Sequence, residues 1–411
     1  MTEADVLIVG AGPAGATAAL VLARAGVRVR LLDRSRFPRP KLCGDTLNPG
    51  ALDLLARLGV GADVRAAAVP LEGMTVTGPG GASVTGRYGA GVVGCAMPRS
   101  EFDSILLRHA LAAGATLDED VMVLGPLVEK RTVPHVSGVE ANVCGRHVEL
   151  RAALTIAADG RRSRIAFGLG LAWHPNRPRR WAIGTYFEGV RGVGSVGEMH
   201  VRPRHYLGIA PLPGGLANVC LVVPEEEARR RGRSDRSRPA GAASARTWGD
   251  ALLAEAIVGD PLLRERFEGA RSLSSSTVLG PLAVDAAGEG PRGLLVAGDA
   301  AGFVDPMTGD GMRFALRGGE LAAAEALRLL QEGPDGVPRL GRLLDAEFGR
   351  KRAFNRVIRR LAASPAAIGV AALAGRLRPG VVAWAVRYAG DTAGAGGVSR
   401  STTPRAASPA A

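Results

Sequence analysis

Apolar residues fall into two kinds of pattern near the start of the chain, and each predicts a different element. Residues 5–9 and 27–32 are short apolar runs typical of buried strands, and residues 13–25 between them carry small and apolar residues at helical spacing. This order predicts a βαβ unit, and therefore a parallel sheet with covered faces. Two more buried strands are predicted at residues 154–157 and 294–297, each ending in an acid beside a glycine.

The middle of the chain changes to the pattern of an antiparallel sheet. Consecutive strands are predicted at residues 182–190, 196–201, 206–210 and 216–223. Helices are predicted at residues 99–114, at residues 310–330 and over most of the chain from there to residue 389. Residues 231–245 and the tail from 390 to 411 lack an apolar period, so we expect a loop and a disordered tail.

Composition and charge narrow the class of protein. The 411 residues are 46% hydrophobic and 22% charged, which excludes a disordered chain. The net charge of +13 comes mainly from arginines scattered along the sequence, with one dense run at residues 229–238 that we expect to be a solvated loop. Basic residues are not interleaved with aromatic ones, so we expect no nucleic-acid partner. Anionic ligands, cofactor phosphates or an acidic membrane surface explain the charge better.

Cysteine usage and the chain start favour a cytoplasmic protein. The four cysteines form no C-x-x-C pair and no zinc-type spacing with histidine, so neither a metal site nor a disulfide framework is predicted. The acidic start runs directly into a strand, without room for a signal peptide, and no apolar stretch reaches the length of a membrane span. Residues 361–389 are apolar, with Arg376, Arg378, Arg387, Trp384 and Tyr388 among them. A helical lid on the core is favoured there, and peripheral membrane contact is the alternative.

The first βαβ unit carries a dinucleotide-binding pattern. Residues 10–15 fit G-x-G-x-x-G between a strand and a helix, and Asp33 closes the second strand 23 positions after Gly10. The first glycine makes the tight turn, the second lets a diphosphate approach the backbone, and the third lets helix and strand pack closely. The helix N-terminus then offers free N–H groups, and an acid can accept hydrogen bonds from a ribose. The binding residues predicted from this unit are Gly10, Gly12, Pro13, Ala14, Gly15, Asp33 and Arg34.

Three later features favour FAD over NAD as the dinucleotide. Gly298-Asp299 ends a buried strand, where the acid suits a ribityl hydroxyl group and the small neighbours let the cofactor pass. Residues 305–312 head a long helix whose dipole can stabilise negative charge on a reduced flavin ring. Asp159-Gly160 is a further strand-end acid. The binding residues predicted from these features are Asp159, Gly298, Asp299, Pro306, Gly309, Gly311 and Met312.

With these motifs in order, the chain resembles the FAD-dependent oxidoreductases of the aromatic-hydroxylase fold, and in particular their geranylgeranyl reductase branch. The resemblance covers residues 6–330 and is most branch-specific in Lys41-x-Cys43-Gly44 and in the Asp-Pro-x-Thr-Gly-x-Gly run of residues 305–311. It implies that Arg99, at the start of a helix, contacts FAD. It also implies that the loop of residues 41–44 lies near the flavin and the substrate, with Gly44 as a cofactor-binding residue.

The resemblance implies an α/β fold: a Rossmann-like FAD-binding domain, an antiparallel substrate domain laid over the flavin, and C-terminal helices. The expected FAD-binding parts are residues 1–70, 99–175 and 281–335, and the expected substrate-domain parts are residues 71–98 and 176–280. A helical region then covers residues 336–389, before the tail.

One stretch departs from the branch pattern. Where the reductases carry Tyr-x-Trp-x-Phe-Pro, this chain has Tyr206-Leu207-Gly208-Ile209-Ala210-Pro211, and Asp45 replaces a glycine after Cys43-Gly44. Losing two large aromatic side chains removes a gripping surface for a prenyl chain and widens the pocket, so a bulkier ring or polyketide-like substrate is equally compatible.

The sequence thus predicts an FAD-dependent oxidoreductase acting on a hydrophobic small molecule, with Cys43, Lys41 and Tyr206 as catalytic residues. NAD(P)H visits transiently as electron donor, because no second dinucleotide pattern is credible, or a ferredoxin-like protein replaces it. Reduction and O2-dependent hydroxylation both stay open, as do a non-redox flavin-dependent cyclase and a vestigial flavin-binding protein. A flavin halogenase is disfavoured by the absence of that group's Trp-containing motif. The oligomeric state is not predicted.

Overall fold

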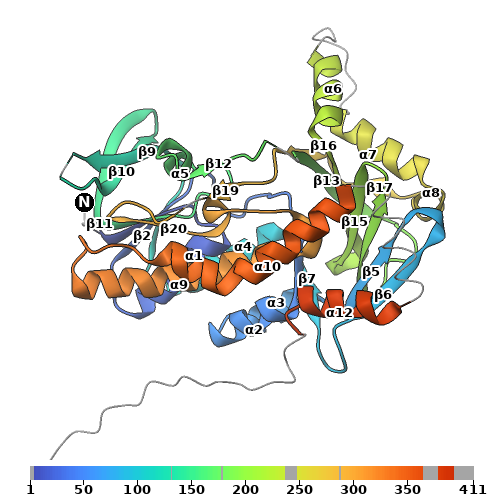
Figure 1. Ribbon diagram of the computed structural model, residues 1–411, viewed down its shortest axis with the longest axis horizontal. Helices are drawn as coiled ribbons and strands as arrows, with labels where there is room; N and C mark the ends of the chain where they lie inside the picture. Colours follow the sequence, from blue (N-terminus) through green and yellow to red (C-terminus); the bar gives the residue numbers. More distant parts are fainter. Residues whose placement is uncertain are drawn as a thin grey trace, which may run out of the picture.

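The structure is a computed structural model that describes residues 4–130, 132–176, 179–236, 248–286, 288–363 and 378–392 (Figure 1). Three predicted features fall partly or mostly outside these residues: the loop of residues 231–245 from residue 237 onward, the apolar segment of residues 361–389 between 364 and 377, and the tail from residue 393. Among the described residues, no helix combines the length and apolar character needed to cross a membrane.

The first sheet has a parallel core. Its parallel strands, in spatial order, are β8 (Thr116–Asp118), β2 (Val29–Leu32), β1 (Ala4–Val9), β11 (Arg146–Ala157) and β20 (Leu294–Val296). β11 is longer than the predicted strand because its first half pairs antiparallel with β10 (His135–Val143), which in turn pairs with β9 (Val121–Glu129). Apolar residues of β9 and β10 share a buried cluster with Leu7, Val9 and Leu32, so this meander covers one face of the sheet.

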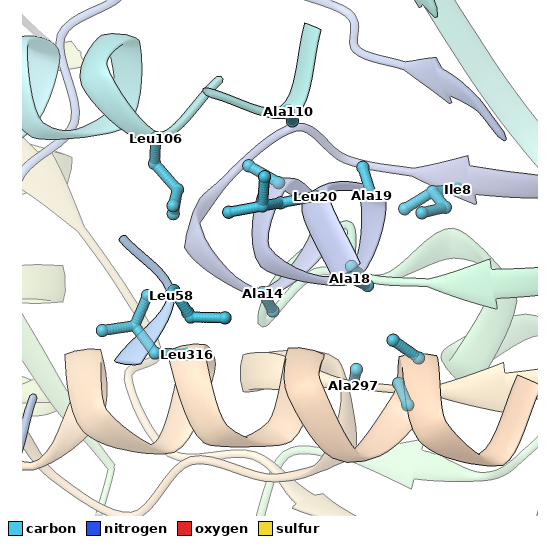
Figure 2. Close-up of a cluster of buried hydrophobic side chains, with 14 of the residues drawn as sticks. Ile8, Ala14, Ala18, Ala19, Leu20, Leu58, Leu106, Ala110, Ala297 and Leu316 are labelled. Carbon is cyan, nitrogen blue, oxygen red and sulfur yellow. The ribbon is translucent and has the colours of Figure 1, made fainter. Parts of the chain in front are cut away.

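Helices cover the opposite face of the first sheet (Figure 1). They are α1 (Pro13–Arg24), α4 (Arg99–Ala112), α9 (Gly311–Glu332) and α10 (Leu340–Ala363). α1 lies between α4 and α9, and its small residues Ala14 and Ala18 point toward α9 (Figure 2). The approach is close, since a Cβ atom on Gly319 of α9 would lie 2.3 Å from the Ala14 carbonyl oxygen. The small residues of the predicted helix therefore serve tight helix packing.

The second sheet is antiparallel apart from one pair. In spatial order it comprises β17 (Arg271–Ser272), β13 (Arg180–Glu188), β16 (Leu216–Pro224), β15 (His205–Leu212), β14 (Val196–Arg202), β5 (Gly73–Thr77) and β6 (Ser83–Arg87), with β18 (Thr277–Leu279) also on β13. Only the β14–β5 pair is parallel. One face, here called the outer face, packs on α7 (Trp248–Gly259) and α8 (Pro261–Arg266), and the inner face turns toward the first sheet's domain.

Short elements connect the two parts. A three-stranded sheet of β3 (Thr46–Leu47), β7 (Gly94–Ala96) and β4 (Val69–Leu71) lies between them, beside α2 (Pro49–Arg57) and α3 (Gly61–Ala67). β12 (Ala172–Trp173) pairs with β19 (Asp285–Ala286), and α5 (Arg164–Gly168) follows β11. Near the C-terminal end of the described chain, α12 (Pro379–Ala389) packs against β6 (Figure 1).

The predicted α/β fold with an antiparallel second domain is confirmed, while the domain boundaries stay predictions. The expected loop over the arginine run is wrong at its start, because residues 225–236 form the helix α6 (Glu225–Arg236). Three glutamates occupy its first turn, where they complement the helix dipole. Glu225 and Glu227 also pair with Arg229 and Arg230 one turn later, which supports the helix locally.

Candidate functional site

The predicted motifs meet because neighbouring parallel strands end at one edge of the first sheet. The strand register aligns Leu32, Val9, Ala157 and Val296 in a single row across β2, β1, β11 and β20. The residues that follow this row are therefore neighbours in space. They are Asp33, Gly10, Ala158-Asp159 and Ala297-Gly298-Asp299. In parallel α/β sheets, this carboxyl edge is where ligands bind.

The glycine turn after β1 fits its predicted roles. Gly10 has a left-handed φ of +96°, and a Cβ atom there would lie 2.4 Å from the Ala158 carbonyl oxygen. A Cβ atom on Gly15 would lie 1.8 Å from the Gly10 oxygen, so these two positions require glycine. Gly12 differs, since its nearest neighbour would be Arg39 Nη2 at 3.5 Å.

The first turn of α1 is left open to a ligand. Gly12 is the N-cap and supplies no side-chain hydrogen bond, while Pro13 and Ala14 are buried in the first turn. A positive helix end without an internal cap is suited to a diphosphate.

Asp33 is held rigidly at the end of β2. Its two carboxylate oxygens accept hydrogen bonds from the amides of Ala11 and Ser35, each at 2.9 Å. Arg34, the neighbouring predicted residue, is exposed. Asp159, which follows β11, is held in a similar way, because its Oδ2 accepts a 2.9 Å hydrogen bond from the Arg164 amide at the start of α5.

Arg99 lies in a buried ion-pair network. Its guanidinium donates two hydrogen bonds, of 2.8 and 2.9 Å, to Asp103 one turn along α4. Arg39 lies between Asp103, at 3.6 Å, and Asp33, at 3.7 Å. Cys43 lies beside Arg99, and burial raises the pKa of its thiol, so the sulfur stays protonated near neutral pH.

Lys41, Arg161 and Asp299 form a second charged cluster beside this network. Burial and then the positive charge of Arg161 lower the pKa of Lys41 to about 8, against the opposing effect of Asp299. Burial also lowers the pKa of Arg161 to about 10 and raises the pKa of Asp299. The cluster therefore holds more positive than negative charge in a partly desolvated place.

These residues fit the diphosphate and ribityl chain of FAD. Arg161 Nη2 and Arg39 Nε are buried and have no hydrogen-bond partner among the described residues. Buried donors without a hydrogen-bond acceptor are costly, and an anion bound here would satisfy both of them. They lie around the open end of α1 and the Asp299 turn, at the sheet edge where the predicted motifs meet.

The loop before α9 is fixed by the second sheet. Tyr206, on the inner face of β15, donates a 2.6 Å hydrogen bond to Asp305, which also accepts from the Met307 amide at 3.1 Å and pairs with Arg180 at 3.4 Å. Burial raises the pKa of Tyr206 well above its ordinary value, so the phenol remains a hydrogen-bond donor. Tyr206 therefore links the second sheet to the loop before α9.

The rest of this loop also fits its predicted role. Pro306 begins the single-turn helix η4 (Pro306–Thr308), and Gly309 takes a left-handed φ of +69° just after it. Gly311 and the buried Met312 start α9. Gly298 has a φ of +65°, and a Cβ atom there would lie 2.9 Å from Ala14 Cβ, which explains the small residues at that turn.

Sequence reasoning missed a polar cluster next to Cys43. Asn218 of β16 donates hydrogen bonds to the Cys43 carbonyl oxygen, at 2.9 Å, and to Asp45 Oδ2, at 2.8 Å. Tyr186 of β13 also contacts the Asp45 carboxyl group. Burial raises the pKa of Asp45 to about 6, although Asn218 and Tyr186 oppose the shift. The replacement of glycine by Asp45 was visible in the sequence, but its partners come from strands without any motif.

Small residues line the inner face of the second sheet. The register aligns Gly184, Cys220 and Gly208 across β13, β16 and β15. A Cβ atom on Gly208 would meet nothing nearer than 3.8 Å, whereas one on Gly184 would lie 2.7 Å from a methyl carbon of Leu42. This row, here called the small-residue row, therefore lies against the loop of residues 41–45 and would accept a Cβ atom at Gly208 without a clash. Gly44 in that loop is exposed and has no neighbour within 4 Å of a Cβ position.

Comparison with known proteins agrees with this geometry. The FAD binding domain family model matches residues 3–323. Digeranylgeranylglycerophospholipid reductase 1 of Methanothermobacter thermautotrophicus is 31% identical over 361 residues, covering 85% of this chain and 84% of that protein. The menaquinone reductase of Mycolicibacterium smegmatis is 32% identical over 336 residues, covering 78% and 76%.

Solved structures share the fold at lower identity. A geranylgeranyl bacteriochlorophyll reductase-like protein of Thermoplasma acidophilum aligns with a TM-score of 0.73 at 24% identity, covering 90% of each chain. A myxobacterial chondrochloren halogenase aligns with a TM-score of 0.75 at 22% identity, covering 93% and 90%. The chain therefore belongs to the FAD-binding-domain family, as an FAD-dependent oxidoreductase of its geranylgeranyl reductase-like branch.

Proposed function

We propose that this protein reduces a carbon–carbon double bond in a hydrophobic molecule of isoprenoid, polyketide or aromatic type. One observation carries the proposal: the small-residue row of the second sheet lies against the loop of Lys41 and Cys43, next to the predicted flavin edge. The names of the two relatives support it, since both are reductases of molecules with isoprenoid chains.

The chain's own residues would hold FAD along the carboxyl edge of the first sheet. The open end of α1, Arg39 and Arg161 would bind the diphosphate, Asp33 the adenosine ribose, and Asp299 the ribityl chain. When bound, FAD supplies hydride transfer at its isoalloxazine ring. Arg99 would hold the loop of Cys43 in place through its contact with the Cys43 side chain, and Tyr206 fixes the loop before α9.

Protonation of the substrate falls to groups beside the small-residue row. Cys43 keeps its thiol proton near neutral pH, which makes the thiol a proton source rather than a nucleophile. Lys41 remains cationic below about pH 8 and would orient an anionic group of the cofactor or substrate. These assignments make Cys43 and Lys41 catalytic residues of the proposed reaction.

The first experiment is an anaerobic absorption titration of the FAD-loaded protein with NADPH and, separately, with NADH. Bleaching of the flavin band by either nucleotide would establish a nicotinamide donor. A band that bleaches only with dithionite would instead indicate a protein donor of ferredoxin type. A chain that binds no FAD would overturn the proposal and leave a vestigial binding domain.

Product mass separates the remaining reactions. Reduction adds two hydrogens to a geranylgeranyl or menaquinone-type substrate, and hydroxylation adds one oxygen with O2 consumption. A cyclase would give an isomer without consuming the donor. We expect the two-hydrogen product. The proposal includes a cytoplasmic protein, whose substrates partition into bilayers.

A further inference from the structure

Helix α10 has one face that packs on the protein and one face that is exposed to solvent. On its inner face, Lys351 pairs with Asp310 at 2.8 Å, Asn355 donates to the same carboxylate at 3.3 Å, and Arg359 donates to the Val304 carbonyl oxygen at 3.3 Å. This face therefore fixes both sides of the loop before α9. The opposite face is exposed and presents Val357, which is 52% exposed.

Helix α12 extends the exposed face of α10. Phe354 of α10 lies edge-on to Trp384 of α12, with ring centroids 6.3 Å apart, and Trp384 stacks on Tyr388. Val386 on the other side of α12 anchors the helix against Gly86 of β6. Val381 and Trp384 then face solvent, with 57% and 49% of their surface exposed. An apolar patch on two adjoining helices needs an explanation beyond core packing.

Exposed arginines surround this patch. Arg350, Val357 and Arg360 share a helix face by their spacing, and Arg387 lies one turn after Trp384. Within the described part of the chain, no acidic side chain forms an ion pair with any of these three arginines. The acids nearby are already engaged: Asp345 pairs with Arg352, Glu347 with Arg313 and Arg317, and Asp391 with Lys351. The patch thus combines apolar side chains with unneutralised positive charge.

We propose that this basic apolar surface, formed by Val357, Val381, Trp384, Arg350, Arg360 and Arg387, docks on an anionic phospholipid bilayer. Tryptophan and valine enter the interfacial region, and arginines bind the negative headgroups. A second copy of this chain is the less suitable occupant, because a two-fold contact would bring like charges together.

This inference deepens the proposed function, on which it rests only for the substrate. The docked helix α10 directly backs the loop before α9, so a hydrophobic substrate would leave the bilayer beside the flavin domain. Vesicle binding is measured without turnover, and reduction is measured with detergent-dispersed substrate, so either proposal can fail alone.

The test is co-sedimentation of the full-length, FAD-loaded protein with phosphatidylglycerol vesicles and with phosphatidylcholine vesicles at low and physiological salt. We expect binding to phosphatidylglycerol that weakens with salt and is far weaker on phosphatidylcholine. The variant Arg350→Ser/Arg360→Ser/Arg387→Ser should lower the partition coefficient about 100-fold, since each arginine near such a surface contributes about a fivefold gain. Trp384→Ala should lower it by roughly tenfold.

Matched controls separate this surface from general charge. Arg65, Arg108 and Arg146 are exposed arginines outside it, and Arg65→Ser/Arg108→Ser/Arg146→Ser removes the same net charge. Trp173→Ala removes an exposed tryptophan on β12. Flavin content checks the folding of every variant. Equal losses in the two triple variants, equal binding to both lipids, or no sedimentation of the wild-type protein would overturn the inference.

Discussion

Tyr206 on β15 donates a 2.6 Å hydrogen bond to Asp305, 99 residues later in the chain, and so joins the second sheet to the loop that begins α9. Both side chains are buried, and Arg180 from the neighbouring part of the sheet neutralises the carboxylate. Hydrogen bonds to charged groups are stronger than neutral ones, and a buried carboxylate is costly without them. The hydrogen bond therefore fixes the position of the second sheet relative to the loop before α9.

Tyr206→Phe should lower the free energy of unfolding by roughly 1.5–3 kcal/mol, since a buried charged acceptor loses one donor. FAD affinity should fall with it, because the loop before α9 loosens. Chemical denaturation and flavin fluorescence measure the two effects. Tyr88→Phe is the control: this phenol is also buried, but no hydrogen bond of its hydroxyl to a described residue is seen. Unchanged stability with a lost kcat would instead show that Tyr206 acts directly on the substrate.

Gly12→Ala and Gly15→Ala should separate cofactor binding from folding. A methyl group at Gly15 would lie 1.8 Å from a backbone oxygen, so that variant should lose roughly 1–3 kcal/mol of stability or fail to fold. A methyl group at Gly12 meets only the tip of Arg39, so the fold should survive while FAD affinity falls about tenfold. Thermal unfolding without FAD and equilibrium dialysis with FAD test the pair. Unchanged FAD affinity in Gly12→Ala would contradict the placement of the diphosphate.

Asp45 should make the stability depend on pH. Burial raises its pKa from 3.8 to about 6, so the folded protein binds this proton more tightly than the unfolded chain does. Protonated Asp45 therefore stabilises the folded state. This contribution to the free energy of unfolding is fully present below the ordinary pKa of 3.8 and is lost as the pH rises through about 6. Relative to Asp45→Asn, wild-type protein should therefore lose about 2 kcal/mol between pH 4 and pH 7. Denaturant unfolding of both proteins across that range measures the difference, and parallel curves would refute it.

Lys41 should make FAD binding depend on pH near its lowered pKa of about 8. An anionic cofactor binds the protonated ammonium group, so FAD affinity should fall as the pH rises through this value. Lys41→Met should bind FAD about tenfold more weakly and without this pH dependence. Isothermal titration between pH 7 and pH 9 measures both, with Lys130→Met as the exposed control. If FAD binding by Lys41→Met kept the same pH dependence, the group that titrates would be a residue other than Lys41.

Gly208→Trp should narrow the substrate range without affecting FAD. A Cβ atom fits at this position, with its nearest neighbour at 3.8 Å, and the larger indole would have to extend over the small-residue row. Bulky ring substrates should lose at least about tenfold in kcat/KM, while FAD content stays constant. Gly208→Ala is the control and should change little. Equal activity of both variants toward all substrates would place the substrate elsewhere.

The sequence by itself determined the cofactor half of the site. Gly10, Gly15 and Asp33 sit on one βαβ unit, in which short connections and fixed handedness leave a single arrangement. The acids of residues 159 and 299 could also be placed, because parallel strands share one carboxyl edge. Local chemistry at these points dictates the geometry, so a pattern in the chain is enough to find it.

Only the tertiary structure decided the substrate half. Asn218 and Tyr186 reach Asp45, and Tyr206 reaches Asp305, through the register of strands that no short motif describes. The start of the arginine run is likewise helical and not a loop, because glutamates one turn earlier pair with Arg229 and Arg230. A side chain's partner across a sheet depends on pairing between distant segments, and that pairing is fixed by packing of the whole fold rather than by any local pattern.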